Sequence, residues 1–190
     1  MADSWDQQDF EWVEIEDRFP LGMCLTLVSS TEVSAILDGF HTVRPRGARM
    51  PADADFDEWM SSMFSDATAG MRFAGQNGEW TWVLEEVGIA GGTPPLPQRL
   101  SGTYGRAVSV LWTVNLDSRF VYARHGDVLR DFELGREAEP GGEGLEGYLD
   151  EEDGLDWEQW MSAGLCLQAR VTGVVALPNG AVDALITETA

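Results

Sequence analysis

A run of alternating apolar and polar residues between positions 105 and 133 constrains the fold more than any other feature of the sequence. Every second residue in its first part is apolar, at Val108, Val110, Trp112 and Val114. Short turns at 116–118 and 125–126 divide the remainder into two further apolar stretches. A period of two places successive side chains on opposite faces of a strand. The pattern predicts a three-stranded antiparallel meander with one face turned to the core.

The rest of the chain adds a hairpin, a buried strand and several helices. Residues 71–84 alternate around a GQNG segment, which predicts a β-hairpin, and the apolar run 22–29 predicts a buried strand. Apolar residues at helical spacing predict four helices, over 33–40, beginning near residue 55, over 156–171 and over 180–187. Residues 41–51 and 88–102 are predicted to be connections. Helices and strands do not alternate regularly. We therefore expect an α+β fold with an antiparallel sheet of about five strands and three to four helices packed mainly on one face.

A chain of 190 residues is long enough for one domain with its own core. We expect an acidic N-terminal segment over 1–18 and a single α+β domain over 19–190. Within that domain, residues 135–155 are rich in Gly, Pro and Glu and are predicted to form an acidic, mobile loop. No apolar run approaches the roughly 18 residues of a membrane span. The N-terminus also lacks the pattern of a secretory signal, so we expect a cytoplasmic protein with no membrane partner.

Negative charge is concentrated in two parts of the sequence. The formal net charge is −21, and 17 of the 33 carboxylates fall within residues 3–17 and 137–158. The remaining 16 are set against all 12 basic residues, so the rest of the chain carries only −4. Charge of this sign and placement disfavours direct nucleic-acid binding, because phosphates would be repelled.

The residue types needed for several kinds of chemistry are missing or scarce. All basic residues are arginine, which excludes Schiff-base lysines and the phosphate-binding lysines of P-loop proteins and kinases. The only histidines are His41 and His125, and the only cysteines are Cys24 and Cys166. We therefore expect no metal site, no cofactor and no catalytic residue, and we interpret both thiols as buried core residues.

Tryptophan is unusually frequent, with eight residues in the chain. Trp5 and Trp12 lie among the N-terminal carboxylates, and indole rings often anchor protein interfaces. Our first hypothesis is a non-catalytic interaction module, of an immunity-type, inhibitory or regulatory kind, that binds a partner protein; a basic partner would fit. Its candidate partner-binding residues are Trp5, Trp12, Asp150, Glu151, Glu152 and Asp153.

A second hypothesis is a small-molecule binder or a cofactor-free enzyme of specialised metabolism, with a pocket on the aromatic face of the sheet. In this hypothesis a carboxylate at residue 85 or 86 lies beside the pocket, and an arginine holds an anionic group. The candidate pocket residues are Trp80, Trp82, Glu85, Glu86, Trp112, Arg119 and Tyr122. The oligomeric state is left open.

Four segments of the sequence carry a resemblance: FPLGMCLTLVSSTEVSAILDGF, GEWTWVLEEVG, AVSVLWTVNLDSRFVYARHGDVLRDFE and VTGVVALP. Together they resemble a family of small, acidic proteins of unknown function that is common in high-GC Gram-positive bacteria. The resemblance spans roughly residues 19–180 and includes Trp80, Glu85, Glu86, Asn115, Arg119, Phe120 and Tyr122. The connection Arg44–Pro51 and the glycine-bearing final segment depart from the usual pattern. The resemblance implies a shared fold and no established activity.

Overall fold

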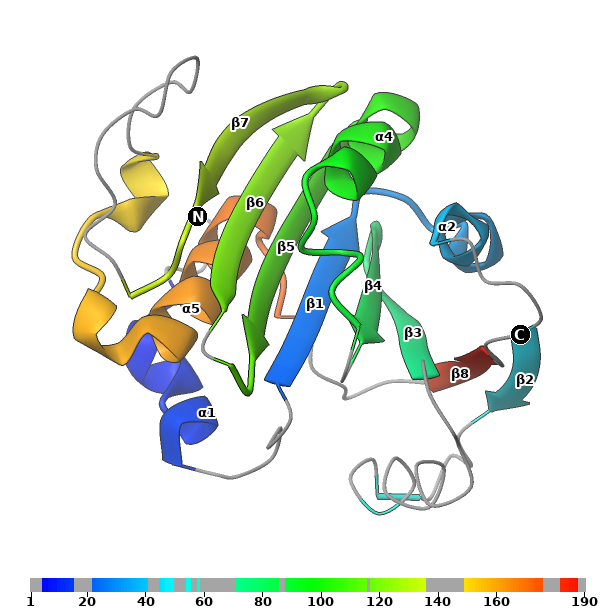
Figure 1. Cartoon of the computed structure of the whole chain (residues 1–190), viewed down its shortest axis with the longest axis horizontal. Helices are drawn as coiled ribbons and strands as arrows, with labels where there is room; N and C mark the ends of the chain where they lie inside the picture. Colours follow the sequence, from blue (N-terminus) through cyan, green and yellow to red (C-terminus); the bar gives the residue numbers. More distant parts are fainter. Residues whose placement is uncertain are drawn as a thin grey trace.

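The computed structural model describes residues 5–15, 22–40, 45–49, 54–55, 58, 71–85, 88–115, 117–135, 149–175 and 182–187. In this part of the chain an eight-stranded antiparallel sheet has the strand order β2-β8-β3-β4-β1-β5-β6-β7 (Figure 1). The strands are β1 (Gly22–Val28), β2 (Pro45–Arg49), β3 (Met71–Asn77), β4 (Trp80–Glu85), β5 (Arg106–Thr113), β6 (Ser118–Arg124), β7 (Asp127–Phe132) and β8 (Val182–Thr187).

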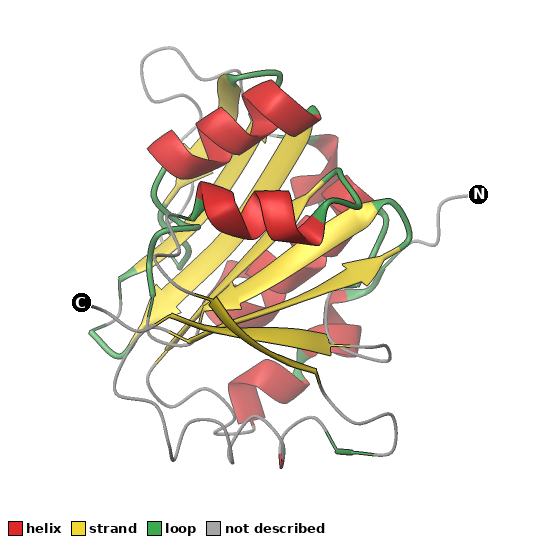
Figure 2. Ribbon diagram, turned by 90° about the vertical axis from the view of Figure 1, so that its right-hand side faces the viewer, coloured by secondary structure: helices red, strands yellow, loops and turns green. Residues whose placement is uncertain are grey.

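Helices cover both faces of the sheet (Figures 1 and 2). One face carries α5 (Trp160–Thr172), which packs against β5 and against the short helices η1 (Gln7–Phe10) and α1 (Trp12–Ile15). The opposite face carries α4 (Pro95–Tyr104) and α2 (Val33–Gly39). Two short turns, η2 (Asp150–Glu152) and η3 (Trp157–Gln159), precede α5 along the chain.

The central strand β1 explains why the core has two layers. All seven of its residues are buried, and their side chains alternate between the two faces. Leu25 and Leu27 belong to the core cluster that includes α5, whereas Val28 packs in a second cluster with residues of α2 and α4. A strand that is buried on both faces has apolar residues at nearly every position, and the sequence of β1 shows such a run.

A buried amide also attaches α5 to the middle of the sheet. Gln168 is 2% exposed, and its Nε2 donates to the carbonyl oxygens of Leu25 (2.9 Å) and Val108 (3.0 Å). These bonds satisfy a polar group that burial would otherwise penalise by about 1–3 kcal/mol. They fix the position of the helix over β1 and β5.

The α+β class and the antiparallel sheet are confirmed, and the sheet is larger than expected with helices on both faces. The hairpin forms as β3 and β4 around a two-residue turn at Gly78, and the meander forms as β5, β6 and β7. Val114 does not belong to the core face, because it follows the end of β5 and is 62% exposed.

Two segments form strands that the sequence did not predict. Residues 45–49 form β2 within the expected connection, and residues 182–187 form β8 where a short helix was expected. Strand β8 pairs with β2 on one side and β3 on the other. Six residues are too few for periodicity to separate a helix from a strand, and pairing with the open edge of β3 decides the outcome.

The expected loop over 88–102 contains α4. Its N-terminal proline, Pro95, suits the first turn of a helix, where a backbone N–H has no intrahelical acceptor. The last part of the expected acidic loop, 149–154, contains η2. The helix expected from about residue 55 falls mostly outside the described residues. None of the helices that the structure describes is long and apolar enough to span a bilayer.

Candidate functional site

The two acidic segments, far apart in the sequence, lie side by side along α5. Gln7 is buried and connects them: its Nε2 donates to the carbonyl oxygens of Asp156 (2.9 Å) and Gln159 (3.2 Å) and to Ser162 Oγ (3.1 Å). Its Oε1 accepts from the backbone N–H of Asp156 at 2.7 Å. One amide side chain therefore satisfies backbone groups of η3 and fixes the N-terminal segment against it.

A single arginine near the end of α5 also holds both segments. Arg170 Nε donates to the carbonyl oxygen of Trp5 (3.0 Å), and its Nη1 donates to the carbonyl oxygens of Glu151 (3.0 Å) and Asp153 (2.9 Å). A guanidinium has five N–H donors in a rigid plane, so it can bridge several acceptors at once. These contacts go to backbone oxygens and leave the neighbouring carboxylates at the surface.

Six exposed carboxylates result from this arrangement, and we name them together the acidic surface: Asp6, Asp9, Asp150, Asp153, Asp156 and Glu158. Some of them also stabilise local structure. Asp6 Oδ1 accepts from the N–H of Gln8 (3.1 Å) at the start of η1, and Asp156 Oδ1 accepts from the N–H of Glu158 (3.0 Å) at the start of η3. The side chains of Asp150, Asp153 and Glu158 accept none of the hydrogen bonds found among the described residues.

The two N-terminal tryptophans are only partly available for contact. Trp5 is half-buried and packs edge-on against Phe10, with ring centroids 6.5 Å apart. Trp12 is also half-buried and packs against the core cluster around α5. Both indoles therefore contribute to packing and are only partly exposed.

Glu152 is not at the surface, which corrects its assignment to a partner-binding region. Its carboxylate binds Arg130 of β7 through two bonds of 2.7 and 2.9 Å, and both side chains are 1–2% exposed. Its Oε1 also accepts from the N–H of Leu149 at 3.1 Å. The guanidinium of Arg130 stacks on Phe132 at 4.3 Å. Of its neighbours, Glu151 is half-buried, while the carboxylates at 150 and 153 are exposed.

The predicted pocket residues are divided between the two faces of the sheet. Four aromatic residues face α5 and are at most 9% exposed: Trp80, Trp82, Trp112 and Tyr122. They are part of the core cluster between the sheet and α5. Glu85 and Arg119 occupy positions of the opposite parity in their strands and so project to the other face, and Glu86 lies outside the described residues.

Glu85 is buried beneath the loop that precedes α4. Its Oε1 accepts from Arg72 Nε at 2.9 Å, and its Oε2 accepts from the N–H of Gly91 at 2.7 Å. Burial and, secondly, the adjacent Glu85 raise the pKa of the Cys24 thiol well above its usual value. The carboxylate thus holds the loop in place, and the thiol beside it remains protonated and unreactive at neutral pH.

The glycines of this loop allow it to lie close against the sheet. A Cβ on Gly91 would overlap Thr26 Oγ1 and come within 2.9 Å of Cys24 Sγ, and a Cβ on Gly92 would lie 2.7 Å from Leu111. No larger residue fits at these positions without a shift of the loop. The position of the loop is therefore fixed by contact with the sheet.

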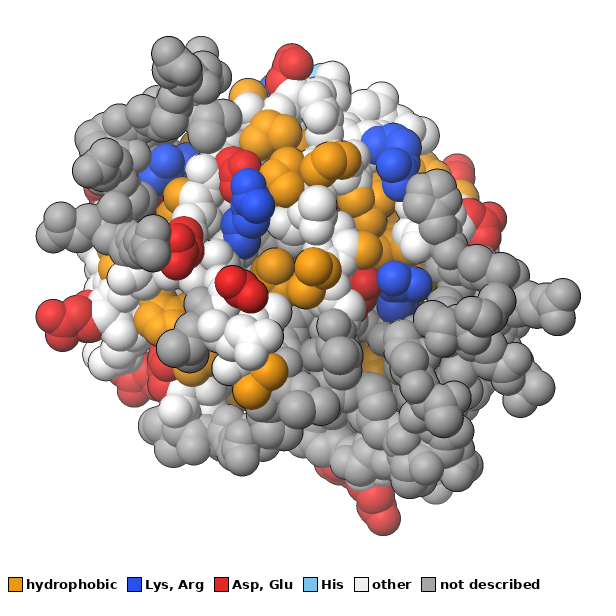
Figure 3. All heavy atoms as spheres, viewed as in Figure 1, with side chains coloured by type: hydrophobic (Ala, Val, Ile, Leu, Met, Phe, Trp, Pro, Cys, Tyr) orange, Lys and Arg blue, Asp and Glu red, His pale blue; other side chains and the backbone are white. Residues whose placement is uncertain are grey.

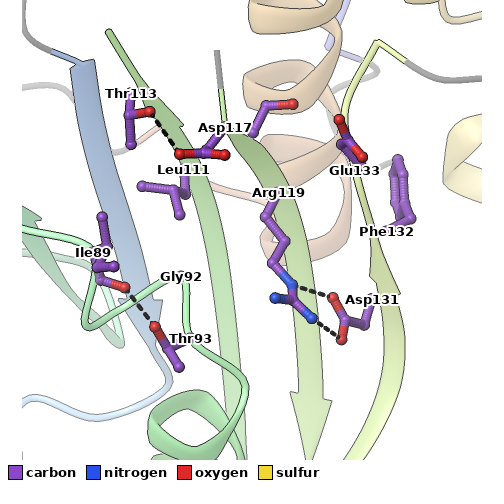
Figure 4. A pocket seen from close by; sticks show the side chains of 11 residues that line it. Ile89, Gly92, Thr93, Leu111, Thr113, Asp117, Arg119, Asp131, Phe132 and Glu133 are labelled. Carbon is purple, nitrogen blue, oxygen red and sulfur yellow. Dashed lines mark hydrogen bonds and ion pairs between the residues drawn. The ribbon is translucent and has the colours of Figure 1, made fainter. Parts of the chain in front are cut away.

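On its outer side the same loop forms one wall of an open hollow of about 640 Å³ (Figure 4). Ile89 and Thr93 line this wall, Leu111 lies on the floor, and Asp117 lies at the end of β5 and β6. We name this space the hollow. Figure 3 shows the face on which it lies, where hydrophobic side chains gather beside acidic and basic ones.

Arg119 is the basic residue that lines the hollow. Its Nε and Nη2 bind the two carboxylate oxygens of Asp131 at 2.6 and 2.7 Å (Figure 4). These hydrogen bonds raise the pKa of the Arg119 guanidinium above its usual value. Because the pair is bidentate, the positive charge of Arg119 is neutralised within the protein, which weakens any hold on an anionic ligand.

The comparisons give a family but no activity. A model of a family of unknown function, DUF6461, matches residues 4–180. The chain belongs to this family. A search of curated proteins and a search of solved structures found no match. A function for this DUF6461 chain must therefore be argued from the chemistry of its own described residues.

Within the described part of this DUF6461 chain, no three His, Cys, Asp or Glu side chains gather in a way that could hold a metal ion. Sequence reasoning found the two acidic segments but missed the residues that join them, Gln7 and Arg170. It also missed Asp131 as the partner of Arg119. Alternation within β6 and β7 could have placed Asp131 and Arg119 on one face, but the register of the two strands is not readable from the sequence.

Proposed function

We propose that this DUF6461 protein is a non-catalytic interaction module whose acidic surface binds a basic partner protein in the cytoplasm. The observation that carries the proposal is the pair of connections through Gln7 and Arg170, which place two separate acidic segments next to each other. Brought together, six carboxylates create a stronger local field than either segment alone. Such a field speeds the encounter with a basic surface and selects against acidic partners.

The half-buried tryptophans near this surface support the proposal. Trp157 lies in η3 between two members of the acidic surface and packs edge-on against Phe132, with centroids 5.4 Å apart. Trp160, at the start of α5, packs in the same way against Trp112 at 6.3 Å. Rigid aromatic side chains among carboxylates offer apolar contact area at a low cost in conformational entropy.

The alternative function, a small-molecule binder or cofactor-free enzyme with a pocket on the aromatic face, has weaker support. The aromatic side chains expected to line that pocket pack against α5. Glu85 is engaged by Arg72 and Gly91 beneath a tightly packed loop. One observation still favours ligand binding, namely the hollow on the opposite face.

Capture of the partner from cells that express the protein natively, followed by measurement of association rates, tests the proposal. The diagnostic variant combines Asp150→Asn, Asp153→Asn and Glu158→Gln, whose side chains support no described hydrogen bond. A control variant combines Glu32→Gln, Glu79→Gln and Asp127→Asn, which are exposed carboxylates elsewhere. Both variants change the net charge by the same amount, and Glu152 is left intact because its carboxylate is structural.

The diagnostic variant is expected to lower the association rate about tenfold or more at low ionic strength, with the difference shrinking as salt is added. The control variant should associate nearly as fast as the natural protein. If both variants slow association equally, only the overall charge matters and the acidic surface has no special role.

A further inference from the structure

The hollow is formed by elements whose positions are fixed by hydrogen bonds. The loop wall is held by the 2.7 Å bond from the N–H of Gly91 to Glu85. At the other end, the N–H of Thr113 donates to the carbonyl oxygen of Asp117 at 2.9 Å and closes the turn between β5 and β6. The Arg119–Asp131 pair connects β6 to β7 across the floor. A site that is already formed loses little conformational entropy when a ligand enters.

The lining places apolar groups next to a carboxylate. Ile89 is 53% exposed, and Leu111 lines the same hollow. Asp117 is exposed at the edge, and among the described residues its side chain makes only a long 3.4 Å contact with Thr113 Oγ1. Since Asp131 neutralises Arg119, Asp117 is not opposed by the guanidinium. A methylene chain that ends in a cation matches this order of apolar and acidic groups.

The hollow and the acidic surface lie on opposite faces of the sheet, and one aromatic contact at the edge strand β7 links them. Phe132 lines the hollow and also packs against Trp157, which lies between Asp156 and Glu158. The ends of β6 and β7 are joined there as well, because Ser118 Oγ donates to the carbonyl oxygen of Leu134 at 2.8 Å. A partner that extends from the acidic surface around the edge strand β7 would meet the hollow.

We infer that the hollow receives one long basic side chain, lysine or arginine, of the protein partner. The aliphatic stem of that side chain lies on Ile89 and Leu111, and its charged end binds Asp117. The identity of the partner rests on the proposed function, but the recognition of the side chain does not. The hollow can therefore be tested on the protein alone with a small probe.

The probe is N-acetyl-arginine amide, added to the isotope-labelled full-length chain while backbone NMR signals are followed. N-acetyl-citrulline amide is the comparison compound, since it has nearly the same shape and no charge. Asp117→Asn removes the proposed anchor, Ile89→Ser removes the exposed apolar contact, and Asp127→Asn is a matched control at an exposed carboxylate outside the hollow.

The expected result is a saturable change in the signals of Gly92, Thr93, Leu111 and Arg119, with a dissociation constant in the millimolar range. Binding should weaken about threefold to fivefold in Asp117→Asn, as fits an exposed ion pair, and stay unchanged in Asp127→Asn. Ile89→Ser should weaken it by a similar factor, and the citrulline compound should bind less tightly than the arginine compound.

Three results would overturn the inference: equal binding of both compounds, equal effects of Asp117→Asn and Asp127→Asn, or signal changes confined to residues 150–158. The last result would leave the proposed function standing, because the acidic surface would still attract the cation. Conversely, saturable binding in the hollow together with unchanged partner association in the acidic-surface variant would reject the proposed function alone.

Discussion

Arg130 of β7 and Glu152 of η2 form an ion pair that is almost completely withdrawn from solvent, with each side chain 1–2% exposed and two bonds of 2.7 and 2.9 Å. The pair fixes the segment before α5 to the edge strand of the sheet. A charge buried in this way depends on its counter-charge, since water cannot replace it.

Glu152→Gln is therefore expected to lower the free energy of unfolding by about 3–5 kcal/mol, because the buried Arg130 guanidinium would lose the negative charge that lies 2.7 and 2.9 Å from it. Chemical denaturation monitored by tryptophan fluorescence measures the change. Glu151→Gln, one residue earlier and half-buried, is the control and should change stability by less than about 1 kcal/mol. Equal effects of the two substitutions would mean that the buried pair contributes nothing special.

Two glycine-to-alanine substitutions should act in opposite directions. Gly91→Ala places a methyl group against Thr26 Oγ1 and Cys24 Sγ and should destabilise the protein by about 1–3 kcal/mol. Gly102→Ala lies on the exposed side of α4, where the nearest atom to its Cβ would be 3.5 Å away, and should stabilise the protein by about 0.5–1 kcal/mol. Thermal unfolding of both variants checks the signs. A stable Gly91→Ala variant would show that the loop can move away from the sheet.

The buried thiol of Cys24 should make stability fall in alkaline solution. Burial raises its pKa in the folded chain, so the unfolded chain loses this proton first, from about the ordinary thiol value of 9.0 upward. The stabilisation that the protonated Cys24 thiol provides is thus fully present below pH 9. It is lost as the pH rises toward the pKa of the thiol in the folded chain, by at most about 1.4 kcal/mol per pH unit for this group.

Denaturation curves between pH 8 and pH 10 measure this slope for the natural protein and for Cys24→Ala. The variant should lose stability at all pH values because of the cavity, but its slope should be shallower. Cys166, whose pKa burial also raises, remains in both proteins and serves as an internal reference. Identical slopes would contradict the assignment to Cys24.

Arg170→Ala should loosen both acidic segments together. Its three carbonyl acceptors, in residues 5, 151 and 153, would lose a charged donor, which costs about 2–4 kcal/mol in total. Hydrogen exchange read by mass spectrometry should become faster in peptides from both segments. Arg124→Ala, at an exposed position of β6, should leave both unchanged. Faster exchange in one segment only would mean that Arg170 does not couple them.

Much of the fold was predictable because it depends on local patterns. The apolar run that became β1, the alternation that became the hairpin and the meander, and the helical spacing that became α2 and α5 all lie within short stretches of sequence. The failures at β2 and β8 have a different origin. Those residues form strands because neighbouring edges offer hydrogen-bond partners, and such partners are not visible in a six-residue window.

The candidate site was predictable only as a list of residues. The acidic segments and Arg119 were identified, but Glu152 was placed at the surface and the tryptophans of the sheet were placed around a pocket. Whether a carboxylate is exposed depends on what faces it, and Arg130 lies 22 residues away in the chain. Composition could not distinguish Glu152 from its exposed neighbours.

The sequence by itself determined the α+β class, the positions of the strands that show clear alternation, and the concentration of charge in two segments. Each of these follows from residue type and local spacing. Only the tertiary structure decided which carboxylates are buried, that the two acidic segments meet, and that Arg119 is bound by Asp131. Contacts over long chain separations depend on strand register and helix placement, and these are settled by packing of the whole core.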